Sequence, residues 1–225
     1  MSEHMALENL TVLDLTRVLA GPFCTMMLAD MGANVIKIEV PKGGDDTRGY
    51  PPFRAKNLNG ERESVYFANI NRNKKGITLN LKAPEGKEIF KELVKKADIV
   101  VENYRPGVMD KLGLGYDVLK EINPRIIYAA VSGFGCYGPY HLRPGYDILA
   151  QAMGGMMSIT GSKGGEPTRA GSALGDILGG LHVTIGILAA VNARTITGKG
   201  QRVDVSLMDS MICLLYTSPS PRDGL

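Results

Sequence analysis

The sequence of 225 residues contains no tryptophan, three cysteines and three histidines. Cys24, Cys136 and Cys213 are odd in number, and none has the close paired spacing of a zinc site. A disulfide framework is therefore not expected, and a reduced, cytoplasmic setting fits best. The histidines are isolated from one another, so each is expected on the surface or in the core, and no bound metal is predicted.

Strong charge and long apolar runs are also missing. The formal net charge is +3, which is too small to indicate a nucleic-acid partner. The first residues lack the basic start and apolar run of a secretory signal. The longest apolar stretch, residues 185–191, is much shorter than the ~20 residues that span a bilayer. We therefore expect neither nucleic acid nor a membrane as a partner, and the 44% hydrophobic content is enough for a globular core.

Short apolar runs alternate with longer segments of helical periodicity. The runs predict strands at residues 11–15, 34–39, 77–81, 98–102, 125–131 and 202–207. Between them, the patterns predict helices at residues 23–31, 84–97, 116–122, 147–157 and 176–195. This alternation is typical of parallel βαβ units. The predicted fold class is therefore α/β, with a Rossmann-like parallel sheet and flanking helices.

The loops that follow four of the predicted strands are candidate binding segments. In open α/β sheets, ligands bind beyond the carboxyl ends of the strands. Residues 17–21, 40–46, 103–107 and 132–138 occupy those places and are rich in glycine, proline, asparagine or arginine. Neither a Gly-x-Gly-x-x-Gly turn after the first strand nor a Gly-x-x-x-x-Gly-Lys-Ser/Thr loop occurs. Binding of NAD or FAD in the usual Rossmann manner is thus not expected.

Asp176 is the candidate nucleophile. It stands between Gly175 and Gly179, ahead of an apolar helix and among segments that allow close backbone approach. Such a place suits a carboxylate nucleophile. Spacing alone, however, favours an aspartate that caps the start of the helix and interacts with its dipole. Both interpretations are open at this point.

The ordered series Arg143-Pro-Gly-Tyr-Asp147, Gly175-Asp176-Ile-Leu-Gly179 and 197–207 closely resembles the class III coenzyme A-transferases, the group of formyl-CoA and carnitine-CoA transferases. The resemblance implies that Asp176 forms a covalent aspartyl intermediate. The expected function is an acyl-CoA:carboxylate CoA-transferase, with a coenzyme A thioester as substrate and no permanently bound cofactor. The acid must be ionised, which a carboxyl group of ordinary pKa, about 4, is at neutral pH.

The same resemblance assigns residues to coenzyme A. By similarity to formyl-CoA transferase, those expected to contact it are Leu19, Ala20, Leu79, Asn80, Leu81, Lys82, Asn103, Tyr104, Arg105, Lys111, Pro144, Gly145, Tyr146 and Asp147. Independently of it, Lys74, Lys75, Lys82, Arg105 and Lys111 form a plausible cationic rim for phosphates, although a solvated face explains each lysine equally well.

Two positions depart from the family pattern. Val40 stands where many members carry an arginine, and Leu19 where formyl-CoA transferase carries a glutamine, so formate or oxalate as substrate is not favoured. The stretches 14–23, 44–48 and 71–75 look most like the members that use succinyl-CoA and dicarboxylates.

Two other functions stay open. The α-methylacyl-CoA racemases share this fold, but their catalytic histidine stands at the place of Tyr146. A phenol with a pKa of about 10 is a poor partner for proton exchange at neutral pH, which favours transfer. The second alternative is a non-catalytic CoA-binding module.

The C-terminal residues differ in character from the rest. Residues 213–223, Cys-Leu-Leu-Tyr-Thr-Ser-Pro-Ser-Pro-Arg-Asp, can be back-translated codon for codon into the end of a transposon-type sequencing adapter. We therefore interpret 213–225 as adapter read-through and 1–212 as an incomplete large domain with the start of its connection to a small domain. The expected partners are an acyl-CoA, a small carboxylic acid and, for the parent enzyme, a second chain in an interlocked homodimer. The fragment alone is expected to be inactive.

Overall fold

The structure is a computed structural model and describes residues 4–54, 60 and 62–216. Its centre is a six-stranded parallel sheet in the order β3-β2-β1-β4-β5-β6. The strands are β1 Thr11–Asp14, β2 Asn34–Glu39, β3 Lys75–Thr78, β4 Ile99–Glu102, β5 Ile127–Ser132 and β6 Arg202–Ser206. The order reverses between β1 and β4, which is the place where open α/β sheets bind ligands.

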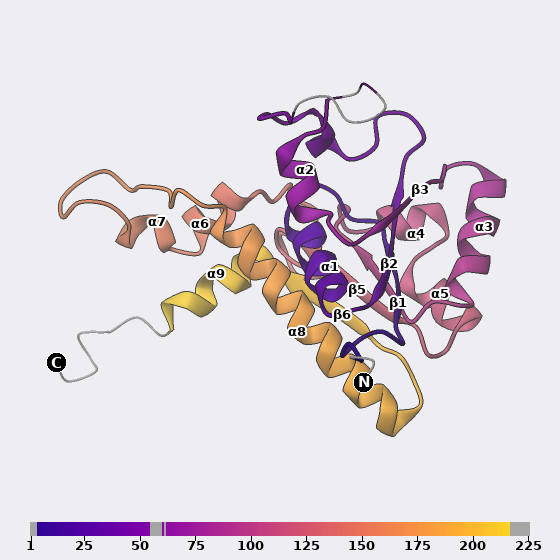
Figure 1. Cartoon of the computed structure of the whole chain (residues 1–225). Helices are drawn as coiled ribbons and strands as arrows, with labels where there is room; N and C mark the ends of the chain where they lie inside the picture. Colours follow the sequence, from indigo (N-terminus) through magenta and orange to yellow (C-terminus); the bar gives the residue numbers. More distant parts are fainter. Residues whose placement is uncertain (1–3, 55–59, 61, 217–225) are drawn as a thin grey trace.

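Helices cover both faces of the sheet (Figure 1). One face packs against α1 (Ala20–Asp30) and α8 (Leu174–Thr197), and the other against α3 (Pro84–Val94) and α5 (Tyr116–Ile122). Alternate residues of one strand enter the two layers: Val12 belongs to the first core and Leu13 to the second. Burial on both faces explains why the central strands are continuously apolar. The predicted α/β sheet with flanking helices is confirmed.

Several element bounds match the prediction and others do not. The strand at 34–39 and the helix at 116–122 have the predicted bounds. The predicted strand at 77–81 is instead Lys75–Thr78, because its pairing with β2 begins opposite Ile36. The predicted helix at 147–157 is broken into α6 (Asp147–Met153) and α7 (Met156–Ile159). Gly155 between them has a φ of +87°, which no helix continues through.

Four short elements were not predicted. They are η1 (Asp46–Gly49), α2 (Val65–Ile70), α4 (Val108–Leu112) and α9 (Leu207–Leu215). The first begins at the end of the candidate binding loop 40–46, and residues 55–59 lie outside the described part. Helix α9 includes three residues of the predicted adapter tail, and Leu214 packs against the core; residues 217–225 lie outside the described residues.

Helix α8 is apolar over a much longer stretch than the uninterrupted run at 185–191. By length and composition alone, its 24 residues are sufficient to cross a bilayer, although a core helix of a soluble protein passes the same test. Within the fold, Val183, Ile187 and Ala190 of α8 are fully buried in the core. The helix is therefore a structural part of the α/β layer on this side of the sheet.

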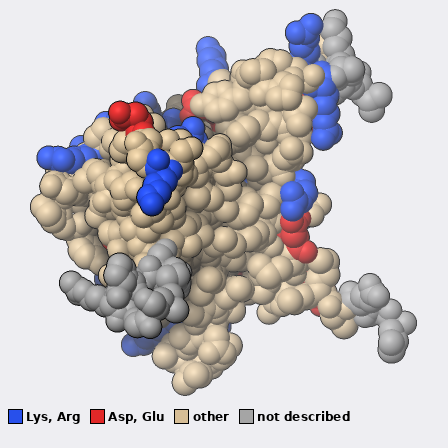
Figure 2. All heavy atoms as spheres, turned by 90° about the vertical axis from the view of Figure 1, so that its left-hand side faces the viewer, with Lys and Arg blue, Asp and Glu red and all other residues tan. Residues whose placement is uncertain are grey.

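The side of the molecule that carries α6, α7 and α9 has few charged residues (Figure 2). Helices α6 to α8 expose large apolar side chains to solvent: Ile148, Met153, Ile159, Leu181 and Ile185. A surface with few charges and such side chains is typical of a face that packs against protein.

Candidate active site

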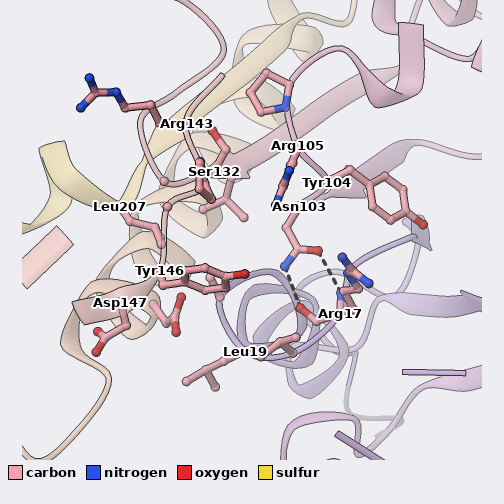
Figure 3. Close-up of a pocket in the computed structure, with 18 residues that line it drawn as sticks. Arg17, Leu19, Asn103, Tyr104, Arg105, Ser132, Arg143, Tyr146, Asp147 and Leu207 are labelled. Carbon is pink, nitrogen blue, oxygen red and sulfur yellow. Dashed lines mark hydrogen bonds between the residues drawn. The ribbon is translucent and has the colours of Figure 1, made fainter. Parts of the chain in front are cut away.

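A cavity of about 210 Å³ lies beyond the carboxyl ends of β1, β4 and β5 (Figure 3). Its wall consists of the turn after β1, the loops after β4 and β5, the first turns of α6 and α8, and Leu207. The cavity brings together these predicted residues: Leu19, Ala20, Asn103, Tyr104, Arg105, Pro144, Gly145, Tyr146, Asp147 and Asp176. Parallel strands end at one edge of the sheet, which explains why segments so distant in sequence converge.

The turn after β1 is held by side chains from neighbouring strands. The amide of Asn103 brackets Arg17: the Arg17 N–H donates to Oδ1 at 2.9 Å, and Nδ2 donates to the Arg17 carbonyl at 2.7 Å (Figure 3). Val18 has a φ of +67°, a costly conformation for a β-branched residue. Its N–H donates to the buried carboxylate of Asp45. The wall of the cavity is therefore rigid at this point.

Two buried ion pairs lie next to that turn. Asp14 forms an ion pair with Lys74 at 3.0 Å, and Asp45 forms one with Lys37 at 2.9 Å. Burial would raise the pKa of Asp14, but the ammonium groups of Lys74 and Lys37 hold it below its usual value. Lys74, with a side chain that is 2% exposed, is thus no part of a cationic rim. Both predicted interpretations of Lys74, a cationic rim and a solvated face, are wrong, because its partner Asp14 lies sixty positions earlier, in β1.

Asp176 lies in the first turn of α8, but it does not cap the helix. The N-cap is Ala173, which provides no side-chain hydrogen bond. Within the described part of the chain, no residue donates a hydrogen bond to the Asp176 carboxylate or pairs with it. Burial, with a further contribution from Asp147, raises its pKa to about 6, against the effect of Arg169. The expected ordinary pKa is thus wrong, yet about nine-tenths of the carboxyl groups are ionised at pH 7.

Two glycines of α8 bring Asp176 against the turn after β1. A Cβ at Gly180 would lie 2.7 Å from the Ala20 carbonyl, and one at Gly179 would lie 2.4 Å from Leu207 Cδ2. Only glycine permits both approaches. The start of α8 therefore packs on the start of α1, and the first turns of both helices line the same cavity.

A second cavity, of about 480 Å³, adjoins the first at Tyr104, which lines both. It lies between the ends of β2 and β3 and the helix α4. The predicted residues Leu79, Asn80, Leu81 and Lys82 line it together with Val40 and Lys42. Lys111 lies outside the lining of both cavities as the structure describes them.

Sequence reasoning missed several residues of the first cavity. Arg17 and Ser132 lie in two of the loops that were singled out, and Arg143 in the quoted motif, but none was named as a site residue. Tyr66 lies on the unpredicted helix α2, and burial, together with the charge of Asp176, raises its pKa to about 12. No sequence signal placed Tyr66 near Asp176.

Comparison with known proteins identifies the family to which the chain belongs. The family described as CoA-transferase family III matches residues 7–220. The chain is 51% identical to an acyl-CoA transferase of Fusarium pseudograminearum, covering 95% of this chain and 48% of that protein. It is 48% identical to a succinyl-CoA:mesaconate CoA-transferase of Haloarcula marismortui, covering 93% of this chain and 53% of that protein.

Among solved structures, a CAIB/BAIF family protein from Brucella suis is 43% identical and superimposes with a TM-score of 0.90. That match covers 97% of this chain and 60% of the Brucella protein. The chain therefore belongs to CoA-transferase family III. It spans about half the length of the curated relatives it matches.

Proposed function

We propose that the full-length protein that contains this chain is an acyl-CoA:carboxylate CoA-transferase in which Asp176 is the nucleophile. The observation that carries the proposal is the position of Asp176, a partly buried carboxylate in a cavity at the switch point of the sheet. Among the described residues it has no hydrogen-bond or ion-pair partner. Membership of CoA-transferase family III and the names of the relatives support the same reaction.

In the proposed reaction, a carboxylate oxygen of Asp176 attacks the thioester carbonyl carbon of the donor. The C–S bond breaks, which gives a mixed anhydride and the CoA thiolate. The thiolate then attacks the aspartyl carbonyl carbon and releases the donor acid, leaving an aspartyl-CoA thioester. The acceptor carboxylate repeats these steps in reverse order, and the final cleavage returns Asp176 as a carboxylate with a new acyl-CoA.

Each of these steps places negative charge on a carbonyl oxygen. Leu19 and Ala20 begin α1 and line the cavity with Asp176. N–H groups in the first turn of a helix have no partner within the helix. We assign to them the stabilisation of the oxyanion, and the support of this turn by Asn103 and Asp45 fits that role because such donors must be held in place beforehand.

Coenzyme A fits the two cavities that meet at Tyr104. The first cavity, with Asp176, would hold the thioester group. The second, with Leu79 to Lys82, would hold the end of coenzyme A that is remote from the thioester. Lys42 and Lys82 line the second cavity and suit phosphate groups. Lys111, outside both, would act at longer range.

A dicarboxylic acid is the acceptor we propose. Three arginines, Arg17, Arg105 and Arg143, belong to the lining of the cavity that contains Asp176. The guanidinium of Arg17 also pairs with Asp46, and that of Arg143 lies over the ring of Tyr140. Arginine is well suited to bind a carboxylate. The Haloarcula relative is named for succinyl-CoA, whose acyl group keeps one free carboxylate, and for mesaconate, which is a dicarboxylic acid.

We further propose that the full-length enzyme is an interlocked homodimer. The side of the molecule over α6 to α9 has few charged residues and exposes Ile148 and Ile185, which supports a protein partner there (Figure 2). Light scattering of the full-length protein tests this proposal, because a monomer at micromolar concentration would contradict it.

The nucleophile is tested by Asp176→Ala in the full-length protein. Turnover should fall by several orders of magnitude, because binding alone does not replace a nucleophile. Mass spectrometry after incubation with acyl-CoA should find an adduct on the Asp176 peptide of the wild type. Asp117→Ala, on the exposed surface of α5, is the control. More than about a tenth of the wild-type rate in Asp176→Ala would refute the assignment.

The racemase alternative has a separate test. Tyr146, which is 66% exposed, lies in the cavity wall where the racemases carry histidine. We expect no rapid incorporation of deuterium at the α-carbon of a 2-methylacyl-CoA in deuterated water. Rapid incorporation that is lost in Tyr146→Phe would favour the racemase. A non-catalytic module would show neither exchange nor an acyl-enzyme.

A further inference from the structure

Asp147 lies in the cavity wall, but its carboxylate forms hydrogen bonds with neighbouring protein groups. Its Oδ1 accepts the Gly175 N–H at 2.8 Å, and its Oδ2 accepts Gln151 Nε2 at 2.8 Å and Arg169 Nε at 3.1 Å. The residue is 8% exposed. Asp147 also lies across the cavity from Arg17 and Asn103 (Figure 3). These contacts indicate a role other than the expected one in binding coenzyme A.

Gln151, one turn further along α6, extends the same set of contacts. Its side chain is fully buried. Its Oε1 accepts the Ala170 N–H at 2.9 Å, and its Nε2 donates to the Ser172 carbonyl at 3.3 Å as well as to Asp147. Two side chains of α6 thus hold the segment 169–175, which ends directly before Asp176.

The first turn of α8 depends on this support. Its N-cap, Ala173, provides no side-chain acceptor, so the Asp147 carboxylate supplies one from another helix. The Gly175 N–H lies 2.8 Å from Asp147 Oδ1, and a side chain at residue 175 would be crowded against the same oxygen. A change in the Asp147 contact is therefore transmitted to the next residue, Asp176.

Asp147 also determines where the positive charge of Arg169 lies. Arg169 is partly exposed, with a side chain that is 44% accessible, and it pairs with Asp147. It is close enough to Asp176 to lower the pKa of that residue. If Asp147 were neutral, Arg169 would have Asp176 as its remaining carboxylate partner in this cluster. An ion pair there would hold the attacking oxygen away from a thioester.

We propose that Asp147 is a positioning residue for Asp176: its carboxylate fixes the first turn of α8 and keeps Arg169 from pairing with the nucleophile. This inference rests on the proposed function of Asp176. In the part of the chain that the structure describes, Asp147 from α6, Arg169 from the loop before α8 and the phenol of Tyr66 from α2 interact electrostatically with Asp176. The other charged or titratable residues that line the same cavity are Arg17, Arg105, Arg143 and Tyr146.

The two charges have opposite effects that can be measured. The Asp147 carboxylate contributes to the raised pKa of Asp176, and Arg169 opposes it. In the full-length enzyme, Asp147→Asn should therefore move the acid limb of kcat/KM to lower pH, and Arg169→Ala should move it to higher pH, each by roughly half a unit or more. Arg169→Ala leaves the Asp147 bonds to Gly175 and Gln151 in place, so it tests the charge effect without loss of fold.

Turnover and binding separate positioning from substrate contact. Asp147→Asn should lower kcat roughly 10- to 100-fold through misplacement of the nucleophile. The Kd for acyl-CoA, measured in an Asp176→Asn background that prevents turnover, should stay within about threefold. The double variant Asp147→Asn/Arg169→Ala should recover part of the lost kcat, roughly tenfold, because the competing cation is gone. Melting curves confirm that each variant is folded.

The results divide clearly. Parallel loss of acyl-CoA affinity and kcat in Asp147→Asn would show a substrate contact and overturn the positioning role. Acid limbs that stay in place or move in the same direction in both single variants would also overturn it, as would a double variant less active than Asp147→Asn. Turnover by Asp176→Asn would instead overturn the proposed function itself, whatever the Asp147 variants show.

Discussion

Replacing Asp176 by asparagine should stabilise the folded protein at neutral pH while it abolishes turnover. The pKa of Asp176 is raised from 3.8 to about 6, mainly by burial. One pKa unit corresponds to about 1.4 kcal/mol, so the ionised carboxylate lowers the free energy of unfolding by about 3 kcal/mol. Asparagine has nearly the same shape and no charge, so the variant should not suffer this decrease in the free energy of unfolding.

The sign of the pH dependence follows from the raised pKa. The folded state binds the proton more tightly than the unfolded state, so the neutral acid adds stability that is complete below about pH 4. That stability is lost as the pH rises through about 6. The advantage of Asp176→Asn should therefore be largest at pH 7 and should vanish near pH 4, where the wild-type group is also neutral.

The assay is thermal unfolding of the full-length protein at both pH values. A gain of about 3 kcal/mol corresponds to roughly 3–6 °C in Tm for a protein about twice the length of this chain. Asp209→Asn is the matched control, because Asp209 is an exposed aspartate in the first turn of another helix, α9. A Tm at pH 7 that is equal to or below that of the wild type, or an equal gain at pH 4, would refute the argument.

Three further outcomes are expected. The kcat/KM of the full-length enzyme should fall on the acid side with a midpoint near pH 6, where Asp176 becomes protonated; a flat profile down to about pH 5 would contradict this. Lys74→Met should cost about 3–5 kcal/mol in denaturant unfolding because it leaves Asp14 buried without its counter-charge, whereas exposed Lys75→Met should have little effect. Gly180→Ala should lower kcat clearly while the thermal unfolding curve still shows a folded protein, because the added methyl group forces apart the α8–α1 contact that places the nucleophile. An unchanged kcat would disprove the role of that contact.

Most of the fold follows from local pattern. The strand at 34–39 and the helix at 116–122 could be predicted because apolar periodicity and the stop before Pro124 act within a few residues. The convergence of the loops after β1, β4 and β5 also follows once the strands are parallel. The short helices α2 and α4 could not be predicted, because so few residues give no clear period. Helix α9 was missed because its first residue was assigned to a strand and its last three to the adapter tail.

The parts of the site that depend on distant partners were beyond sequence reasoning. Lys74 stands in a basic stretch that predicts a surface, but its pairing with Asp14 buries it. Asp176 was correctly placed at the start of a helix, whereas its raised pKa arises from burial and from Asp147, which only the fold brings near. Whether the predicted residues contact coenzyme A stays a prediction.

The composition of the cavity wall has a consequence for how the protein is synthesised. The wall draws on Arg17, on Asn103 from 86 positions later and finally on Leu207 after the last strand. Contacts of such long sequence separation form late in folding. A nascent chain that already contains Asp176 but has not reached Leu207 would have the nucleophile without its pocket. Acyl-CoA binding should therefore arise abruptly as synthesis passes β6, and not gradually as each segment emerges.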